Sequence, residues 1–297
     1  MTFTFNDRDE KNIENLKATI SNIPHIENLS DRIKYSTYTV DFNFERRIVI
    51  PKNIPVLSFV DPFGYKGITR GLISKLIENN GSDCIFFFNY NRINMALSSN
   101  TKFDEYLAGI FGVEKTALLK EQLAPLSPSE REPIVLDAII SVLRQNAGKY
   151  VLPFKFYANE MRRTSHFIIF VSKHPQGGKI MKDIMYANSA KDIDGVATFE
   201  FKDSHNFNNE FEQLSMFNRP LQSLCDDLYD QYKGTKISVQ FLCNRYACDV
   251  SNYFVPKNVK DALRRLEAQD KIVVYGRTRK TYKGELTMPD RALIEFK

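Results

Sequence analysis

The stretch "YVLPFKFYANEMRRTSHFIIFVSK", residues 150–173, decides the fold of this chain. Its two ends, residues 150–160 and 165–173, are rich in β-branched and aromatic side chains, which favour strands. Only "MRRT", residues 161–164, separates them, whereas a parallel crossover needs about a dozen residues or more. The two strands are therefore predicted to pair as an antiparallel hairpin.

Upstream of the hairpin, strand and helix patterns alternate. The predicted elements are a strand at 3–6, a helix at 10–23 with Asp9 as its N-cap, strands at 33–42 and 54–60, a helix at 68–79, a strand at 84–91, and helices within 101–148 capped at Ser127 or Ser129. The strands at 54–60 and 84–91 are nearly all apolar, as expected of strands buried on both faces. This alternation predicts an α/β domain over residues 1–190, with a Rossmann-like, mostly parallel sheet that ends in the antiparallel hairpin.

The last third of the chain follows a different pattern. A short helix is predicted at 176–190, and the polar, Asn- and Phe-rich residues 191–218 are predicted to form a linker or lid. Residues 219–297 contain three amphipathic helical segments and then a two-stranded ribbon with a basic tip. That order predicts a winged-helix-like C-terminal domain.

Composition limits the class of protein. The 297 residues are 43% apolar, enough for two domains with their own cores. No window approaches the roughly 18 apolar residues of a membrane helix, so the chain is expected to be soluble and cytoplasmic, without a membrane partner. The four cysteines form no C-x-x-C pair, so reduced thiols and no metal site are expected.

The positive charge is concentrated at the C-terminal end. Residues 233–297 hold 14 Lys and Arg against 7 Asp and Glu, whereas residues 1–232 hold 27 against 29. The residues predicted to contact nucleic acid are Lys257, Lys260 and Arg264 on one helix face, and Arg277, Arg279, Lys280 and Lys283 at the ribbon tip. The alternative is an ordinary solvated basic surface.

Three carboxylates follow predicted strands: Asp7, Asp41 and Asp61. Parallel sheets bind ligands beyond the carboxyl ends of their strands, so the three acids together indicate a nucleoside pocket. Asp61 begins "DPFG", in which Pro62 fixes the backbone and Phe63 could stack on a flat substrate. The alternatives are that each acid is a helix cap or loop residue, and that "DPFG" only ends a strand.

Several phosphate- and nucleophile-binding motifs are missing. The sequence contains no G-x-x-x-x-G-K-[ST], G-x-G-x-x-G or G-x-S-x-G, and its first glycine is Gly64. No glycine-rich cradle of backbone amides can therefore precede Asp61.

"FVDPFG" (59–64), "FFFNYNRIN" (86–94), "HFIIFVSKHPQGGKIMKDIM" (166–185) and the winged-helix-like tail together resemble the three-Cys-motif partner protein family (TcmP). The resemblance covers the chain from about Phe3 to its end. It implies a class I methyltransferase-like fold that uses S-adenosylmethionine, with Asp7 at the ribose, Asp41 at the adenine, and Asp61, Pro62 and Phe63 at the methyl acceptor. The family's name refers to the cysteines of a neighbouring gene's product, which is an expected protein partner.

The chain departs from the family pattern at one place. Family members open with a strand and a glycine-rich loop that would hold the methionine end of the cofactor, and this sequence starts at what corresponds to the second strand. Two explanations stay open: an upstream or separate segment completes the sheet, or the module is degenerate. The corresponding functions are a methyltransferase acting on nucleic acid or a nucleotide-related acceptor, and a non-catalytic module that binds nucleic acid or a partner. Nuclease chemistry is disfavoured because the acids lack a nearby Glu-x-Lys.

Overall fold

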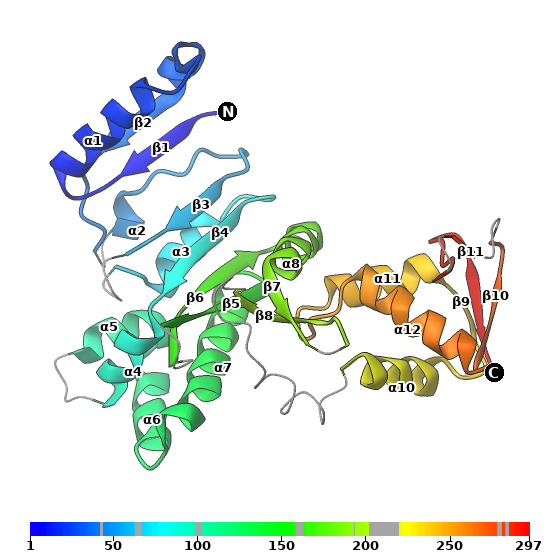
Figure 1. The fold of residues 1–297 in the computed structure, drawn as a ribbon. Coiled ribbons are helices and arrows are strands. Elements are labelled where there is room, and N and C mark those ends of the chain that lie inside the picture. Colours follow the sequence, from blue (N-terminus) through cyan, green and yellow to red (C-terminus); the bar gives the residue numbers. More distant parts are fainter. Residues whose placement is uncertain are drawn as a thin grey trace.

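The computed structural model describes residues 1–41, 44–62, 67–98, 103–158, 163–192, 194–201, 220–277, 281–282 and 285–297. The chain is a mixed α/β protein with a larger N-terminal part, blue to green in Figure 1, and a helical C-terminal part, yellow to red. The α/β class predicted from the alternation of segments is confirmed.

The elements of the N-terminal part are β1 (Phe3–Asn6), α1 (Glu10–Ser21), the 3-10 helix η1 (Ile26–Arg32), β2 (Ile33–Ser36), α2 (Phe44–Arg47), β3 (Leu57–Val60), α3 (Arg70–Leu76), β4 (Asp83–Phe88), α4 (Tyr90–Ser98), α5 (Asp104–Phe111), α6 (Val113–Leu123), α7 (Pro128–Asn146), β5 (Tyr150–Ala158), β6 (Arg163–Ser172), α8 (Pro175–Asn188), β7 (Ser189–Lys191) and β8 (Ala197–Phe201). Those of the C-terminal part are α10 (Pro220–Tyr232), β9 (Lys236–Ser238), α11 (Val239–Cys248), α12 (Pro256–Ala268), β10 (Ile272–Tyr275), β11 (Thr281–Tyr282), β12 (Glu285–Leu286) and β13 (Leu293–Phe296).

The main sheet has six strands in the order β3-β4-β6-β5-β8-β7. β3 pairs with β4 in parallel, and β6 lies antiparallel between β4 and β5. β5 also pairs in parallel with β8. The predicted antiparallel hairpin is confirmed as β5–β6, with a register shift between Phe156 and Tyr157.

Helices cover most of this sheet. On one face, α3 to α7 bury the inward side chains of the strands, among them Phe86 and Phe88 of β4 and Ile169 of β6. Each of these side chains contributes about 2 kcal/mol by leaving water. On the opposite face, α8 packs over β5, β6 and β8, where Leu152 and Phe170 are buried.

The expectation that the strand at 54–60 is buried on both faces is wrong. Leu57 is 71% exposed and Phe59 64% exposed, whereas Val60 on the other face packs against the helical core. The physical reason is position, because β3 is the end strand of the sheet and α8 covers β5 and β6 rather than β3.

β1 and β2 form a separate two-stranded parallel sheet next to β3 (Figure 1). The helix between them starts at the predicted cap, where the Asp9 side chain accepts a bond of 2.9 Å from the Lys11 amide. β2 is shorter than predicted because the backbone of Tyr38 bonds to a side chain instead of a neighbouring strand. The side-chain amide of Asn6 donates to the Tyr38 carbonyl oxygen and accepts from the Tyr38 amide, both at 2.9 Å. Ser127 is the N-cap of α7, so the first of the two caps predicted for this helix is confirmed. The main-chain amide of Ser127 donates to the side chain of Glu130 at 2.8 Å.

The linker predicted at 191–218 needs correction. Residues 189–201 form the antiparallel ribbon β7–β8, which joins the main sheet through β5. The short alternating segment "ATFEF" at 197–201 has its side chains buried in turn, so it behaves as a strand despite its polar surroundings. The rest of the predicted linker, residues 202–219, lies outside the described residues.

In the C-terminal part, α10, α11 and α12 pack around one core with a three-stranded antiparallel sheet. Its order is β10-β13-β9, so β13 lies between the strands that precede α11 and follow α12. Leu228, Leu242 and Leu263, one from each helix, are fully buried in this core.

The two parts contact each other through α8 and the β7–β8 ribbon. Lys182 of α8 is fully buried, and its Nζ atom donates to the carbonyl oxygens of Tyr246 (2.8 Å) and Asp249 (2.7 Å) and to Asn252 Oδ1 (2.9 Å). The Phe199 ring stacks on Tyr253 at 4.6 Å. We call the contacts of Lys182 and Phe199 with residues 246–253 the domain junction.

The described residues contain no membrane-spanning helix and no metal-binding cluster. None of the helices there has the length and apolarity to cross a membrane. No group of His, Cys, Asp or Glu side chains in that part of the chain could hold a metal ion. All four cysteines are free thiols.

Candidate functional site

The candidate site lies at the carboxyl edge of the strands, where β1, β3 and β4 end on the same side of the sheet (Figure 1). Asp7 directly follows β1. Its Oδ1 atom accepts from the Asp9 amide at 2.8 Å and its Oδ2 atom from Asn12 at 3.1 Å. A carboxylate has about four lone-pair positions, so these two bonds orient Asp7 and leave room for a ligand hydroxyl.

Asp41 lies five positions beyond the last residue of β2 rather than at a strand end. Its Oδ1 atom is 2.7 Å from Nη2 of Arg47, at the end of α2. Both side chains are about half exposed, so this ion pair fixes the loop only modestly.

The loops that carry Asp41 and Asp61 are brought together by Gly67. Gly67 has φ +92°, and a Cβ atom there would lie 2.5 Å from the carbonyl oxygen of Val40. Only glycine allows this approach. A second link joins Thr69 Oγ1 to Glu45 Oε2 at 3.0 Å.

Asp61 is exposed just past the end of β3, and Pro62 is half-buried beside it. Phe63, the third predicted catalytic residue, lies outside the described residues. The structure therefore brings the Asp41 and Asp61 loops into contact, whereas Asp7 follows β1 of the separate β1–β2 sheet.

His166, near the start of β6, is the site residue that sequence reasoning missed. Its ring lies between Phe156, at 4.7 Å and nearly parallel, and Phe87, at 4.2 Å. Its Nδ1 atom is 3.0 Å from Ser165 Oγ. Burial lowers the pKa of His166, and the nearby charge of Asp61 opposes that shift. A neutral imidazole next to a carboxylate can accept a proton or a hydrogen bond from a bound hydroxyl or amine.

Polar side chains also meet beside the β5–β6 turn. Lys155 Nζ lies 2.6 Å from Glu132 Oε1, and Glu132 also accepts from the Thr164 hydroxyl. Tyr157 donates to Glu200 at 2.5 Å. These contacts join α7, β5, β6 and β8, and they hold the hairpin end that carries His166 against its neighbours.

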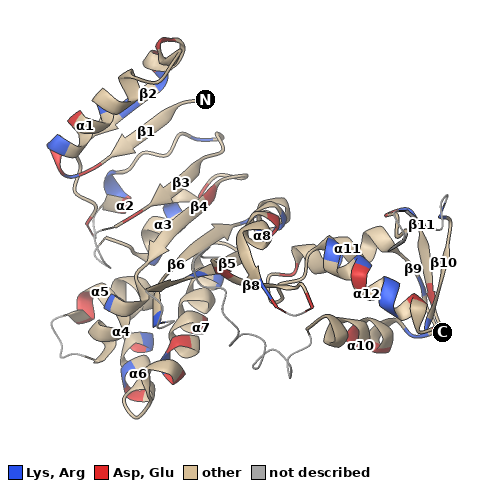
Figure 2. Ribbon diagram, in the orientation of Figure 1, with Lys and Arg blue, Asp and Glu red and all other residues tan. Residues whose placement is uncertain are grey.

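The predicted nucleic-acid residues differ in their surroundings, and Figure 2 shows acidic as well as basic positions on α12. Lys257 is exposed at the start of α12, whereas Lys260 lies 2.8 Å from Asp290 and Arg264 lies 2.6 Å from Asp261. The side chain of Arg277 is only 10% exposed and contacts Glu267 at 2.6 Å, so it lies inside the domain rather than at the ribbon tip. Arg279, Lys280 and Lys283 lie outside the described residues.

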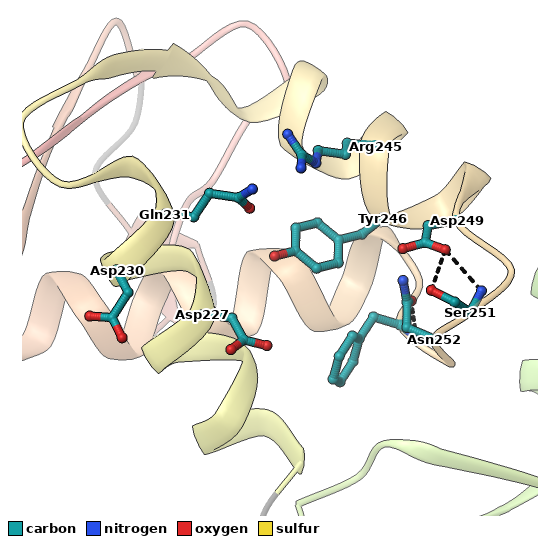
Figure 3. Close-up of a pocket in the computed structure, with 9 residues that line it drawn as sticks. Asp227, Asp230, Gln231, Arg245, Tyr246, Asp249, Ser251 and Asn252 are labelled. Atoms are coloured by element: carbon teal, nitrogen blue, oxygen red, sulfur yellow. Dashed lines mark hydrogen bonds between the residues drawn. The ribbon is translucent and has the colours of Figure 1, made fainter.

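A shallow pocket of about 630 Å³ lies between α10, α11 and the loop after α11 (Figure 3). Its lining residues are Asp227, Asp230, Gln231, Arg245, Tyr246, Asp249, Ser251, Asn252 and Phe254. Three acids against one arginine make it negative, so it does not suit a phosphate backbone. Within the pocket, burial raises the pKa of Tyr246 to about 12, which keeps its hydroxyl neutral.

Neither the scan against family models nor the search of curated proteins returns a match for this chain. The functional conclusion therefore rests on the fold and on the carboxyl-edge residues.

Proposed function

We propose that the chain is a methyltransferase-like protein of the three-Cys-motif partner type, with S-adenosylmethionine as cofactor and nucleic acid or a nucleotide-related molecule as acceptor. One observation carries the proposal: β6 runs antiparallel between β4 and β5, which share a direction. An antiparallel strand at this place is what the resemblance to class I methyltransferases implies. The sheet does not end at the hairpin as expected, because it continues from β5 into β8 and β7. In the same proposal, Asp7 and Asp41 serve the nucleoside, and Asp61 with Pro62 and Phe63 serves the acceptor.

The described residues fit only part of that cofactor. Asp7 keeps free acceptor positions for ribose hydroxyls, and the Asp41 loop lies beside the Asp61 loop. No glycine precedes residue 64, so the segments between β1 and β3 have no glycine-rich loop for the methionine end. The chain alone therefore fits the nucleoside half, and methyl transfer requires that a further segment supply the cradle.

On the acceptor side, this chain's own residues can orient a substrate and take up a proton. The exposed Asp61 carboxylate can accept a hydrogen bond from an acceptor amine or hydroxyl, with Pro62 holding the turn rigid. His166 lies behind it as a mostly neutral base, fixed between Phe87 and Phe156. These roles do not depend on how the cofactor is completed.

The C-terminal part supports the nucleic-acid side of the proposal. Its order is helix, strand, two helices, the strand β10, the small hairpin β11–β12 and the strand β13, which lies in the middle of the three-stranded sheet; a winged helix has a similar order. In that arrangement α12 would be the recognition helix, and Lys257 is its exposed cation. The acid-lined pocket on α10 and α11 marks the face that nucleic acid would avoid.

The second candidate is a non-catalytic module that keeps the scaffold and binds nucleic acid or a partner. The ion pair of Asp41 with Arg47 favours it, since that acid is already partnered within its own chain.

Calorimetric titration with S-adenosylmethionine separates the two candidates. We expect binding whose affinity Asp7→Ala lowers about tenfold and Asp61→Asn leaves unchanged. In the chain with a strand and glycine-rich loop added, Asp61→Asn should abolish methyl transfer, measured separately. Glu14→Ala, an exposed acid on α1, is the matched control and should change neither. Absence of heat, for the chain alone and for the chain with a strand and glycine-rich loop added, would leave only the binding module.

A further inference from the structure

The outer face of β3 carries two large apolar side chains in the open. Leu57 and Phe59 alternate with Ser58 and Val60, so both lie on the face opposite the helical core. Their neighbours in register on β4 are Asp83 and Ile85. We call Leu57, Phe59 and Ile85 the bare β3–β4 face. Monomeric proteins rarely leave neighbouring large apolar groups uncovered without a binding role.

The apolar surface continues onto α8. Ile85 and Met181 both pack against the small core beneath α8. Ile180 and Ile184 lie on the same helix and are 51% and 50% exposed. Ile85 thus links the bare β3–β4 face to the core beneath α8, so a second helix laid over this face would lie beside α8.

The edge of the bare β3–β4 face is also open for strand pairing. β3 ends the order of the six-stranded sheet, and in the described residues β1 pairs with β2 alone. Figure 1 shows β1 as the member of its pair nearer to β3, with the two strands running in the same direction. Strand edges present rows of N–H and C=O groups, and a two-stranded sheet is marginal by itself.

We propose that a separate polypeptide docks here by adding an apolar strand to the β3 edge, with an amphipathic helix laid over Leu57 and Phe59 beside α8. The unpaired backbone N–H and C=O groups at the β3 edge can pair with a strand. The exposed apolar side chains of the bare β3–β4 face can be covered by a helix with one apolar face. One short segment of strand, turn and helix supplies both. The inserted strand would also reach β1 and tie the β1–β2 sheet to the main sheet.

A second copy of the chain fits less well. Two β3 strands that pair antiparallel keep the same face of the sheet on the same side. The two bare faces would then merge into a larger exposed apolar surface, and neither copy would bring a helix to cover it. A different polypeptide that brings its own helix can cover the bare β3–β4 face, so it fits better than a second copy. The carboxyl edge with Asp61 lies at the end of the strand to which it would bind.

The test is a displayed library of segments, each a patterned strand of about six residues, a turn and a helix of about 14 residues. The library is panned against the full chain without any cofactor. We expect selected segments to bind at least about tenfold more weakly to Phe59→Lys and to Ile184→Lys. Met95→Lys, another exposed apolar residue but on α4, is the control and should bind like wild type.

Amide hydrogen exchange gives an independent readout with a selected segment. Exchange should slow at β3 and at β1, and a proline placed in the segment's strand should abolish the effect. Selected binders that are insensitive to Phe59→Lys, or no binders at all, would overturn the proposal. So would a dimer of the chain alone that Phe59→Lys dissociates, because a second copy would then occupy the edge. None of these results depends on S-adenosylmethionine binding.

Discussion

The ammonium nitrogen of Lys182 lies 2.7 Å from the main-chain carbonyl oxygen of Asp249, so a side chain of the α/β part closes the C-terminal end of α11. Burial lowers the pKa of Lys182 to about 7, and the Asp249 carboxylate opposes the shift. The three oxygens around Nζ match the three donors of an ammonium group.

Loss of this contact should loosen the domain junction. Lys182→Met removes the buried donor to the Tyr246 and Asp249 carbonyl oxygens, whereas Asn252 Oδ1 still accepts from the Phe254 amide at 2.9 Å. We expect it to lower the free energy of unfolding by about 3 kcal/mol. Lys179→Met removes one long, exposed bond to Asn244 and should cost less than about 0.5 kcal/mol. Urea denaturation measures both. Equal losses would show that Lys182 does not support the junction.

The stability of the chain should fall between pH 7 and pH 5 because of His166. Its pKa in the folded chain is lowered by burial, so below about pH 6.5 the unfolded chain binds more protons. The folded chain therefore has its full free energy of unfolding, as far as His166 is concerned, above pH 6.5, and loses part of it as the pH falls below that value. His166→Phe keeps a ring between Phe87 and Phe156 and should reduce this loss.

His25→Asn is the control for that experiment, since His25 is exposed and asparagine tolerates its left-handed backbone. Unfolding midpoints in urea at pH 5, 6 and 7 give the comparison. An identical pH dependence in wild type and His166→Phe would refute the assignment.

Gly67 should be the costliest glycine to replace in the site. Gly67→Ala sets a Cβ atom against the Val40 carbonyl as well as straining a positive φ, so we expect a loss of about 3 kcal/mol. Gly234→Ala has φ +74° with open space around it and should lose only about 1 kcal/mol. Thermal unfolding of the two variants measures the difference in lost stability. We attribute that difference to the Val40 carbonyl oxygen, which lies against Gly67 and has no counterpart at Gly234.

Lys257 and Arg277 should respond oppositely to substitution. If α12 contacts duplex DNA, Lys257→Gln should reduce the slope of log affinity against log salt by about 1 and leave stability unchanged. Arg277→Gln breaks a mostly buried ion pair with Glu267, so it should lower stability by about 3 kcal/mol. Fluorescence anisotropy and urea denaturation report the two effects, with Lys11→Gln on α1 as control. An unchanged salt slope in Lys257→Gln would remove α12 from the interface.

The sequence predicted correctly those elements that depend on residues close together in the chain. The hairpin followed from four intervening residues, and the caps at Asp9 and Ser127 followed from side chains that bond their own helix. The exposure of Phe59 was not predictable in this way, because an apolar strand looks the same whether a helix covers it or not.

The missed residues depend on contacts across long stretches of chain. His166 belongs to the site because Phe87 and Phe156 lie on either side of it, and only the sheet order brings those three strands together. The role of Lys182 depends on a loop more than 60 residues further on. The basic side chains Lys257, Lys260 and Arg264 were found correctly on α12. Charge counting does not show that Lys260 pairs with Asp290 from a distant turn, or that Arg277 pairs with Glu267 of α12.

The ribbon β7–β8 belongs to two cores at once. Glu200 of β8 pairs with Lys155 of β5 in the main sheet, while Val196, one residue before β8, is buried among α10, α11 and α12. Neither part can therefore lose its structure without exposing apolar surface of the other. The whole chain should melt in one cooperative transition rather than two, and a fragment cut at residue 219 would expose the place that Val196 fills.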